Sequence, residues 1–125
     1  MTKPSKRDQL VAIFKRERAA FGLPQARLGL STRKVVRKED RNCAVAEPAA
    51  MTIWFHPEAL ETLTRGNMEG LVRHELAHLL DPALSESDTD CLAEEVSGKR
   101  LYYDHRLIQT TAKGTRPRPS RLPEW

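Results

Sequence analysis

The chain has 125 residues, of which 39% are hydrophobic and 30% are charged, and its formal net charge is +4. This size predicts one domain with its own core, and no stretch is long and apolar enough to cross a bilayer. The charged N-terminus lacks the apolar centre of a signal peptide, so a cytoplasmic protein is expected. The two cysteines, Cys43 and Cys91, exclude a disulfide framework and are expected to be buried thiols.

The basic residues gather at the two ends of the chain. Residues 1–18 have a net charge of +4 and residues 113–125 a net charge of +3, whereas the residues between them have a net charge of −3. We therefore expect one domain over residues 1–110 and a basic, Pro/Arg-rich tail over residues 111–125. Such ends are usually solvated, but they also make nucleic acid or an acidic protein a possible partner.

The first half of the chain predicts one helix followed by strands. Apolar residues recur at helical spacing over residues 6–21, and Gly22 ends this helix. Extended chain is predicted over residues 26–38 and 42–46. Residues 51–55 form the clearest strand, because β-branched and aromatic residues follow one another there.

The second half predicts helices. A short one is expected over residues 57–64, and Asn67 is a candidate N-cap for the next. That next helix has a core-facing stripe of apolar side chains, and Asp81-Pro82 stops it. The stripe consists of Met68, Leu71, Val72, Leu76 and Leu79.

The last predicted helix begins at Ser85 or Ser87, either of which can cap it. Its apolar residues continue to Ile108, with an interruption at Gly98. Together the elements predict an α+β fold. A small, twisted, mainly antiparallel sheet would pack on the N-terminal helix and on the helix after Asn67, followed by a C-terminal helix.

The strongest chemical signal is the pentapeptide His74-Glu75-Leu76-Ala77-His78, in the middle of the helix after Asn67. Residues four apart on a helix lie one above the other, so His74 and His78 can bind the same metal ion. Glu75 then lies within reach of a metal-bound water, which is the arrangement used for hydrolysis by a zinc hydroxide. Because a catalytic zinc usually takes three protein ligands, a third ligand is needed.

The acidic segment over residues 81–95, with six acids and no Lys or Arg, is the natural source of that ligand. Glu86 and Asp90 are one helical turn apart and share a face. Glu86 can therefore bind the metal while Asp90 accepts a hydrogen bond from the remote nitrogen of a ligand histidine. Only seven residues separate His78 from Glu86, and this short return leaves competing third ligands. They are Asp81, Asp88, Glu94 and His105.

The H-E-x-x-H of residues 74–78, followed by E-x-x-x-D over residues 86–90, resembles the gluzincin branch of the zincin metallopeptidases. The order of predicted elements over residues 6–109 is similar to that of SprT-like zincin domains. Those domains take a third histidine downstream, and none stands at a comparable position here. The resemblance implies a zincin-like fold that binds Zn²⁺. It implies His74, His78 and Glu86 as ligands, Glu75 as general base and Asp90 as a partner of a ligand histidine.

In activity, the resemblance implies hydrolysis of peptide bonds in a peptide or protein substrate. Strand 51–55 would lie at the edge of the sheet, where an extended peptide can pair with it. A second group would help to stabilise the oxyanion. The expected sources of that group are Tyr102, Tyr103, His105 and Arg100.

A non-catalytic role is the alternative hypothesis. In it, a zincin-like module binds metal only to stabilise its fold, and the basic ends recruit DNA or a protein partner. The two hypotheses differ at Glu75, which matters for proteolysis only in the first. The sequence does not decide the oligomeric state.

Overall fold

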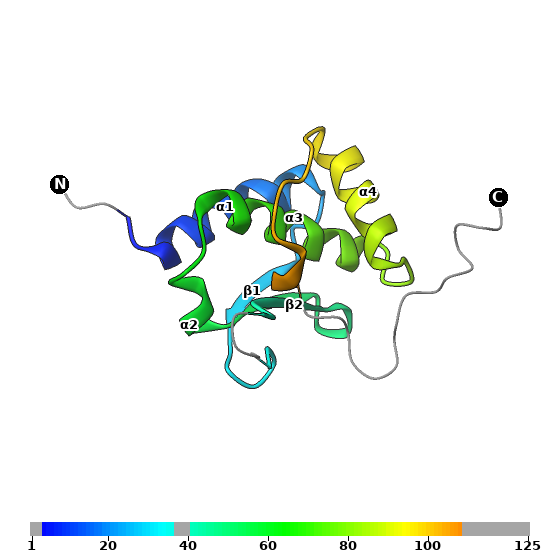
Figure 1. Ribbon diagram of the computed structural model, residues 1–125. Helices are drawn as coiled ribbons and strands as arrows, with labels where there is room; N and C mark the ends of the chain where they lie inside the picture. Colours follow the sequence, from blue (N-terminus) through cyan, green and yellow to red (C-terminus); the bar gives the residue numbers. More distant parts are fainter. Residues whose placement is uncertain (1–3, 37–40, 109–125) are drawn as a thin grey trace.

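The computed structural model describes residues 4–36 and 41–108 (Figure 1). Within these residues the protein is a small α+β domain, which confirms the α+β part of the predicted fold. The α-helices are α1 (Lys6–Ala20), α2 (Pro57–Leu60), α3 (Arg65–Leu80) and α4 (Glu86–Ser97). The strands are β1 (Arg27–Leu30), β2 (Ala44–Glu47) and β3 (Thr52–Phe55), and short 3-10 helices cover Pro48–Ala50 and His105–Leu107. The predicted tail over residues 111–125 lies outside the described residues.

The strands form a mixed sheet in the order β1-β3-β2. β1 runs parallel to β3, and β2 runs antiparallel to it. The predicted "mainly antiparallel" sheet is therefore only half right. The predicted edge position of strand 51–55 is wrong, because β3 pairs on both sides and cannot take a third strand. The short connection from β2 makes β3 its antiparallel neighbour, and β1 then closes the other side.

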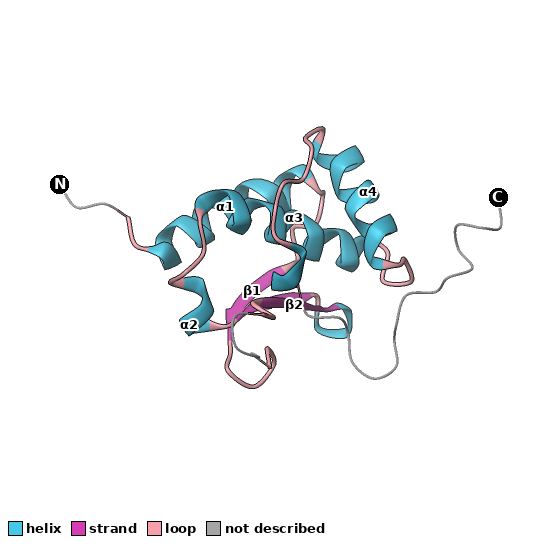
Figure 2. Cartoon of the chain, viewed as in Figure 1, coloured by secondary structure: helices cyan, strands magenta, loops and turns pink. Residues whose placement is uncertain are grey.

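The core lies between the sheet and the helices. Figure 2 shows α1 and α3 on the same side of the sheet. Alternate strand residues point to this side, where Ile53 and Phe55 are fully buried. They belong to one apolar cluster that also contains Leu10 of α1 and Leu71 of α3. The helix that carries the H-E-x-x-H motif is thus held between the sheet and α1.

α3 begins earlier than predicted. The hydroxyl oxygen of Thr64 accepts a hydrogen bond of 3.1 Å from the backbone N–H of Asn67, so Thr64 is the N-cap and Asn67 belongs to the first turn. A threonine hydroxyl satisfies a free N–H at this position as well as an asparagine side chain would. Gly66 also lies inside the helix.

α4 begins as predicted but ends sooner. The hydroxyl of Ser85 caps it by accepting from the N–H of Asp88 at 3.1 Å. Gly98 ends it in the left-handed conformation, with φ of 72°, which glycine adopts without steric cost. The predicted continuation to Ile108 is therefore wrong. Cys43 is buried as expected, whereas Cys91 is exposed, because α4 turns its Thr89 and Ala93 face to the core.

Beyond α4, the segment of residues 101–108 crosses back over α3 to the sheet (Figure 1). The N–H of Leu101 donates to the carboxylate of Glu94 in α4 at 2.9 Å. At the other end, the N–H of Cys43 donates to the carbonyl oxygen of Leu107 at 2.6 Å, and Ile108 forms a bridge with Ala44. This 101–108 segment therefore connects α4 to the start of β2.

A buried ion pair joins α1 to α3. The guanidinium of Arg73 lies 3.0 Å from the carboxylate of Glu17, and both side chains are about 95% buried. Arg16 also contacts this carboxylate, at 2.9 Å, but is half-exposed. Burial opposes ionisation of Glu17, yet hydrogen bonds from Arg73 and Arg16 outweigh it and lower the pKa of Glu17. The pair therefore attaches α1 to α3 at Arg73, the residue immediately before His74.

We expect Arg73→Met to lower the free energy of unfolding by about 3 kcal/mol, because it leaves a buried carboxylate with only one partner. Adding Glu17→Leu should recover most of this loss. The Glu17 pKa is lower in the folded state, so the stabilisation is present above the unfolded value of 4.5 and is lost as the pH falls through the folded value. Urea unfolding of the parent, the single variant and the double variant, repeated over a range of pH, measures the free energies of unfolding and their pH dependence. A loss below about 1 kcal/mol for Arg73→Met would contradict the expectation.

In the part of the chain that the structure describes, every helix is too short or too polar to cross a membrane.

Candidate metal centre

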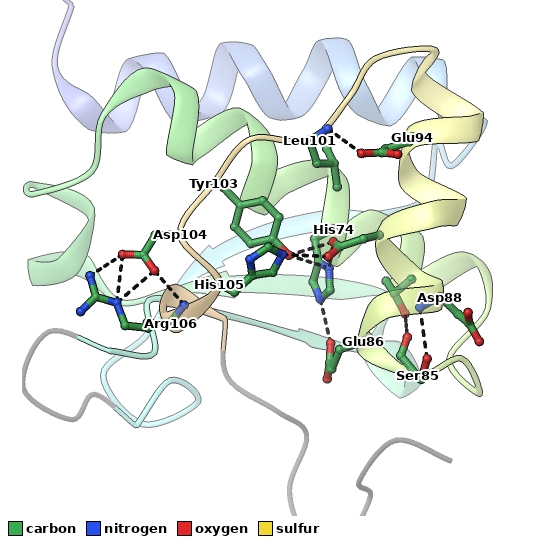
Figure 3. Close-up of polar contacts among 12 residues, drawn as sticks. His74, Ser85, Glu86, Asp88, Glu94, Leu101, Tyr103, Asp104, His105 and Arg106 are labelled. Carbon is green, nitrogen blue, oxygen red and sulfur yellow. Dashed lines mark hydrogen bonds and ion pairs between the residues drawn. The ribbon is translucent and has the colours of Figure 1, made fainter. Parts of the chain in front are cut away.

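Three side chains from α3 and α4 converge on one point. The Nε2 atom of His74 and the Nε2 atom of His78 each lie 2.9 Å from Oε1 of Glu86. The candidate ligand atoms of the three residues all lie within 4.8 Å of one another. Figure 3 shows the Glu86 carboxylate directed at the His74 ring. Together the three residues can hold a metal ion.

Local sequence explains this convergence. His74 and His78 are one turn apart on α3, and the helix places both rings on the same side, with ring centroids 4.7 Å apart. The seven-residue connection from His78 then reverses the chain and ends at the Ser85 cap. Glu86, the first residue of α4, therefore faces back toward the histidines.

Asp90 holds the other end of the His74 ring. Its Oδ1 lies 2.7 Å from Nδ1 of His74. A carboxylate next to Nδ1 keeps a proton on that nitrogen, so Nε2 is the atom that faces Glu86, donates to it in the metal-free protein and can bind a metal once it loses its proton. Asp90 is one helical turn after Glu86, as predicted for a partner of a ligand histidine.

The carboxylates dominate the electrostatics of this group. Burial opposes the charged form of His74, but hydrogen bonds with Asp90 and Glu86 outweigh it and raise the pKa of His74 to about 10. Burial likewise opposes the charged form of Glu86, while hydrogen bonds from His74 and His78 lower its pKa to about 2. Without a metal, a proton on His74 therefore balances the negative charge.

Because a metal must displace that proton, we expect metal binding to release about one proton per ion at neutral pH. Metal affinity should then rise about tenfold per pH unit between pH 6 and 8, as long as His74 is protonated in the metal-free protein. Calorimetric titration with Zn²⁺ in buffers of different ionisation enthalpy counts the protons directly. A binding enthalpy that is the same in all buffers would contradict this expectation.

Glu75 differs from every other acid of the site. Its side chain is 99% buried, and neither carboxylate oxygen has a hydrogen-bond partner among the described residues. Burial, together with the negative charges of Glu86 and Asp90, raises the pKa of Glu75, although the nearby His74 and His78 act to lower it. A buried carboxylate without a partner is costly, and a water held by a neighbouring metal would supply the missing partner.

Comparison with protein families, curated proteins and solved structures gives no match. The site is therefore interpreted from its own geometry.

The competing third ligands lie elsewhere. The carboxylate of Asp81 accepts from the N–H of Ala83 at 3.3 Å, and that of Glu94 is bonded to Leu101. The ring of His105 is 69% exposed and lies 3.1 Å from Oδ2 of Asp90. Asp88 follows the Ser85 cap at the start of α4. Among the described residues, the group that converges with His74 and His78 includes none of these four.

Among the described residues, no hydrogen bond joins a candidate oxyanion donor to the Nε2 atom of His74 or His78. The ring of Tyr102 is exposed and lies beside Arg100. The hydroxyl of Tyr103 donates to Oδ1 of Asp90 at 2.8 Å and lies 3.1 Å from Nδ1 of His74. In Figure 3 the Tyr103 hydroxyl and the Glu86 carboxylate lie at opposite ends of the His74 ring. His105 contacts the same aspartate from the outside.

The sequence pattern does not predict this arrangement around Asp90. Apolar residues that continue to Ile108 predicted more helix, whereas the chain leaves α4 at Ser97 and turns back over α3. The available signal was Gly98, which ends α4 and allows the chain to turn back.

Proposed function

We propose that this protein is a zinc-dependent metallopeptidase with a zincin-like fold of the gluzincin type. The observation that carries the proposal is Glu75. Its buried carboxylate has no protein partner among the described residues and stands between two histidines that converge on Glu86. A purely structural metal site has no use for an unpartnered carboxylate beside its three ligands.

The residues present fit a zinc ion. Two imidazole nitrogens and one carboxylate oxygen form a common ligand set of hydrolytic zinc enzymes, and three protein ligands leave a position for water. A bound zinc ion lowers the pKa of such a water to about 7 and polarises a carbonyl oxygen. His74, His78 and Glu86 would hold the ion. The hydrogen bond from His74 to Asp90 would fix the ring for this purpose.

In this proposal Glu75 moves the protons. Its carboxylate takes a proton from the attacking water and passes it to the amine that leaves when the peptide bond breaks. Burial supports this role because it raises the pKa of Glu75, so the carboxylate is a stronger base than an exposed glutamate. Because Glu75 follows His74 on the same helix, α3 would hold its carboxylate next to a metal bound by His74 and His78.

The direct test is whether the protein hydrolyses peptide bonds in substrates that cover many sequences. The full chain, loaded with one equivalent of Zn²⁺, is incubated with an unfolded protein and with a peptide library, and new chain ends are identified by mass spectrometry. We expect cleavage that stops when a chelator removes the metal and returns when Zn²⁺ is added back. If the zinc-loaded protein cleaves neither substrate, the proposal is wrong.

The alternative of a non-catalytic module that binds DNA or a protein through basic ends stays a prediction of the sequence. Its main element, the basic tail over residues 111–125, lies outside the described residues. DNA binding that persists after removal of metal would favour it.

A further inference from the structure

We infer that Tyr103 is a positioning residue of the metal site, which acts on the ligand His74 through Asp90. This inference rests on the metal site of the proposed function and not on its peptidase chemistry. It assigns Tyr103 a role different from the oxyanion donor expected from the sequence.

Three polar atoms form a closed triangle behind the metal site. The distances are 2.7 Å from Nδ1 of His74 to Oδ1 of Asp90, 2.8 Å from that oxygen to the hydroxyl of Tyr103, and 3.1 Å from the hydroxyl to Nδ1. Because the hydroxyl donates to the carboxylate, its oxygen is free to face the N–H of His74. The phenol thus holds Asp90 in the one orientation that leaves Nε2 of His74 to the metal.

Close packing against α3 fixes the Tyr103 side chain. A Cβ atom built at Gly70 would lie 2.7 Å from Cβ of Tyr103, and 2.9 Å from two of its ring atoms. Only glycine at this position lets the ring approach α3 so closely. On the next residue, the N–H of Asp104 donates to the side-chain oxygen of Asn67 at 3.1 Å. The 101–108 segment is thus attached to the same helix that carries His74.

Removing only the hydroxyl tests the inference. We expect Tyr103→Phe to weaken Co²⁺ and Zn²⁺ binding about tenfold, the lower end of the range for a partner of a metal-bound histidine. Affinity is measured by competition with a chromophoric chelator, and the visible spectrum of bound Co²⁺ reports the ligand geometry. The rise in melting temperature caused by saturating metal should shrink in parallel.

Tyr102→Phe is the matched control, because it removes the same group from the neighbouring residue, whose ring is exposed. It should bind metal like the parent protein. A purely structural role for Tyr103 would lower the melting temperature of the metal-free protein and leave metal affinity unchanged. An affinity of Tyr103→Phe within twofold of the parent would therefore overturn the inference.

A double-mutant cycle shows whether Tyr103 acts through Asp90. Asp90→Asn should weaken metal binding itself, and Tyr103→Phe should then add little, because their effects share one pathway. Additive effects would overturn the inference. If the parent binds no metal, both the inference and the proposed function fail. If it binds metal and cleaves nothing, only the proposed function fails.

Discussion

Replacing Glu75 with glutamine is expected to abolish peptide hydrolysis while metal content stays the same. Glutamine keeps the shape of the side chain but cannot accept a proton from water, and the loss of a general base typically costs about 10²–10⁴-fold in rate. Metal affinity should change little, because His74, His78 and Glu86 are untouched. Turnover of the substrate found in the cleavage screen, measured with equal zinc loading, checks the rate.

Stability gives a second readout for the same variant. The Glu75 carboxylate is buried without a partner, so its neutral replacement should leave the metal-free protein at least as stable as the parent. Glu61→Gln is the matched control because Glu61 is exposed. It should retain full activity. Hydrolysis that survives in Glu75→Gln, with zinc bound, would exclude Glu75 as the base.

Replacing Glu86 with alanine is expected to weaken zinc binding by more than 100-fold. The change removes a ligand itself, whereas the loss of a ligand's hydrogen-bond partner already costs 10–100-fold. It also removes the acceptor that both imidazole Nε2 atoms contact in the metal-free protein. Competition with a chelator measures the affinity, and metal analysis after gel filtration measures occupancy.

Glu95→Ala, on the exposed side of the same helix, is the control for Glu86→Ala. It makes the same chemical change and should leave zinc affinity near that of the parent. If zinc affinity survives in Glu86→Ala, the third ligand is another residue, and parallel variants at Asp81, Asp88, Glu94 and His105 identify it.

The sequence predicted the helices and strands well where local patterns decide them. Periodic apolar residues predicted α1 and α3, and a serine cap for α4 was predicted at Ser85 or Ser87, of which the structure has Ser85. The order of the strands in the sheet could not be predicted, because it depends on how the chain passes from β1 to β2 and not on any pattern within β3. The same holds for α4, whose apolar residues continue beyond Gly98 although the helix does not.

At the candidate site, the spacing of His74 and His78 indicated a shared metal because helix geometry alone aligns them. The placement of Glu86 needed a further fact, the tight turn after α3, which sequence spacing did not settle. The position of Tyr103 could not be predicted, since it depends on contacts between the 101–108 segment and α3. Gly70 did not predict the contact with Tyr103, because a glycine inside a helix rarely indicates which side chain packs against it.

The short connection between α3 and α4 has a consequence for how the protein folds. His74 and Glu86 are 12 positions apart in the chain, so bringing them together closes only a small loop. Pairing β1 with β3 brings Arg27 next to Thr52. This closes a longer loop than the one between His74 and Glu86, and the cost in chain entropy is greater. The metal-binding hairpin therefore has a lower contact order than the sheet, and we expect it to form first. A metal ion can meet its ligands on a chain whose sheet has yet to form.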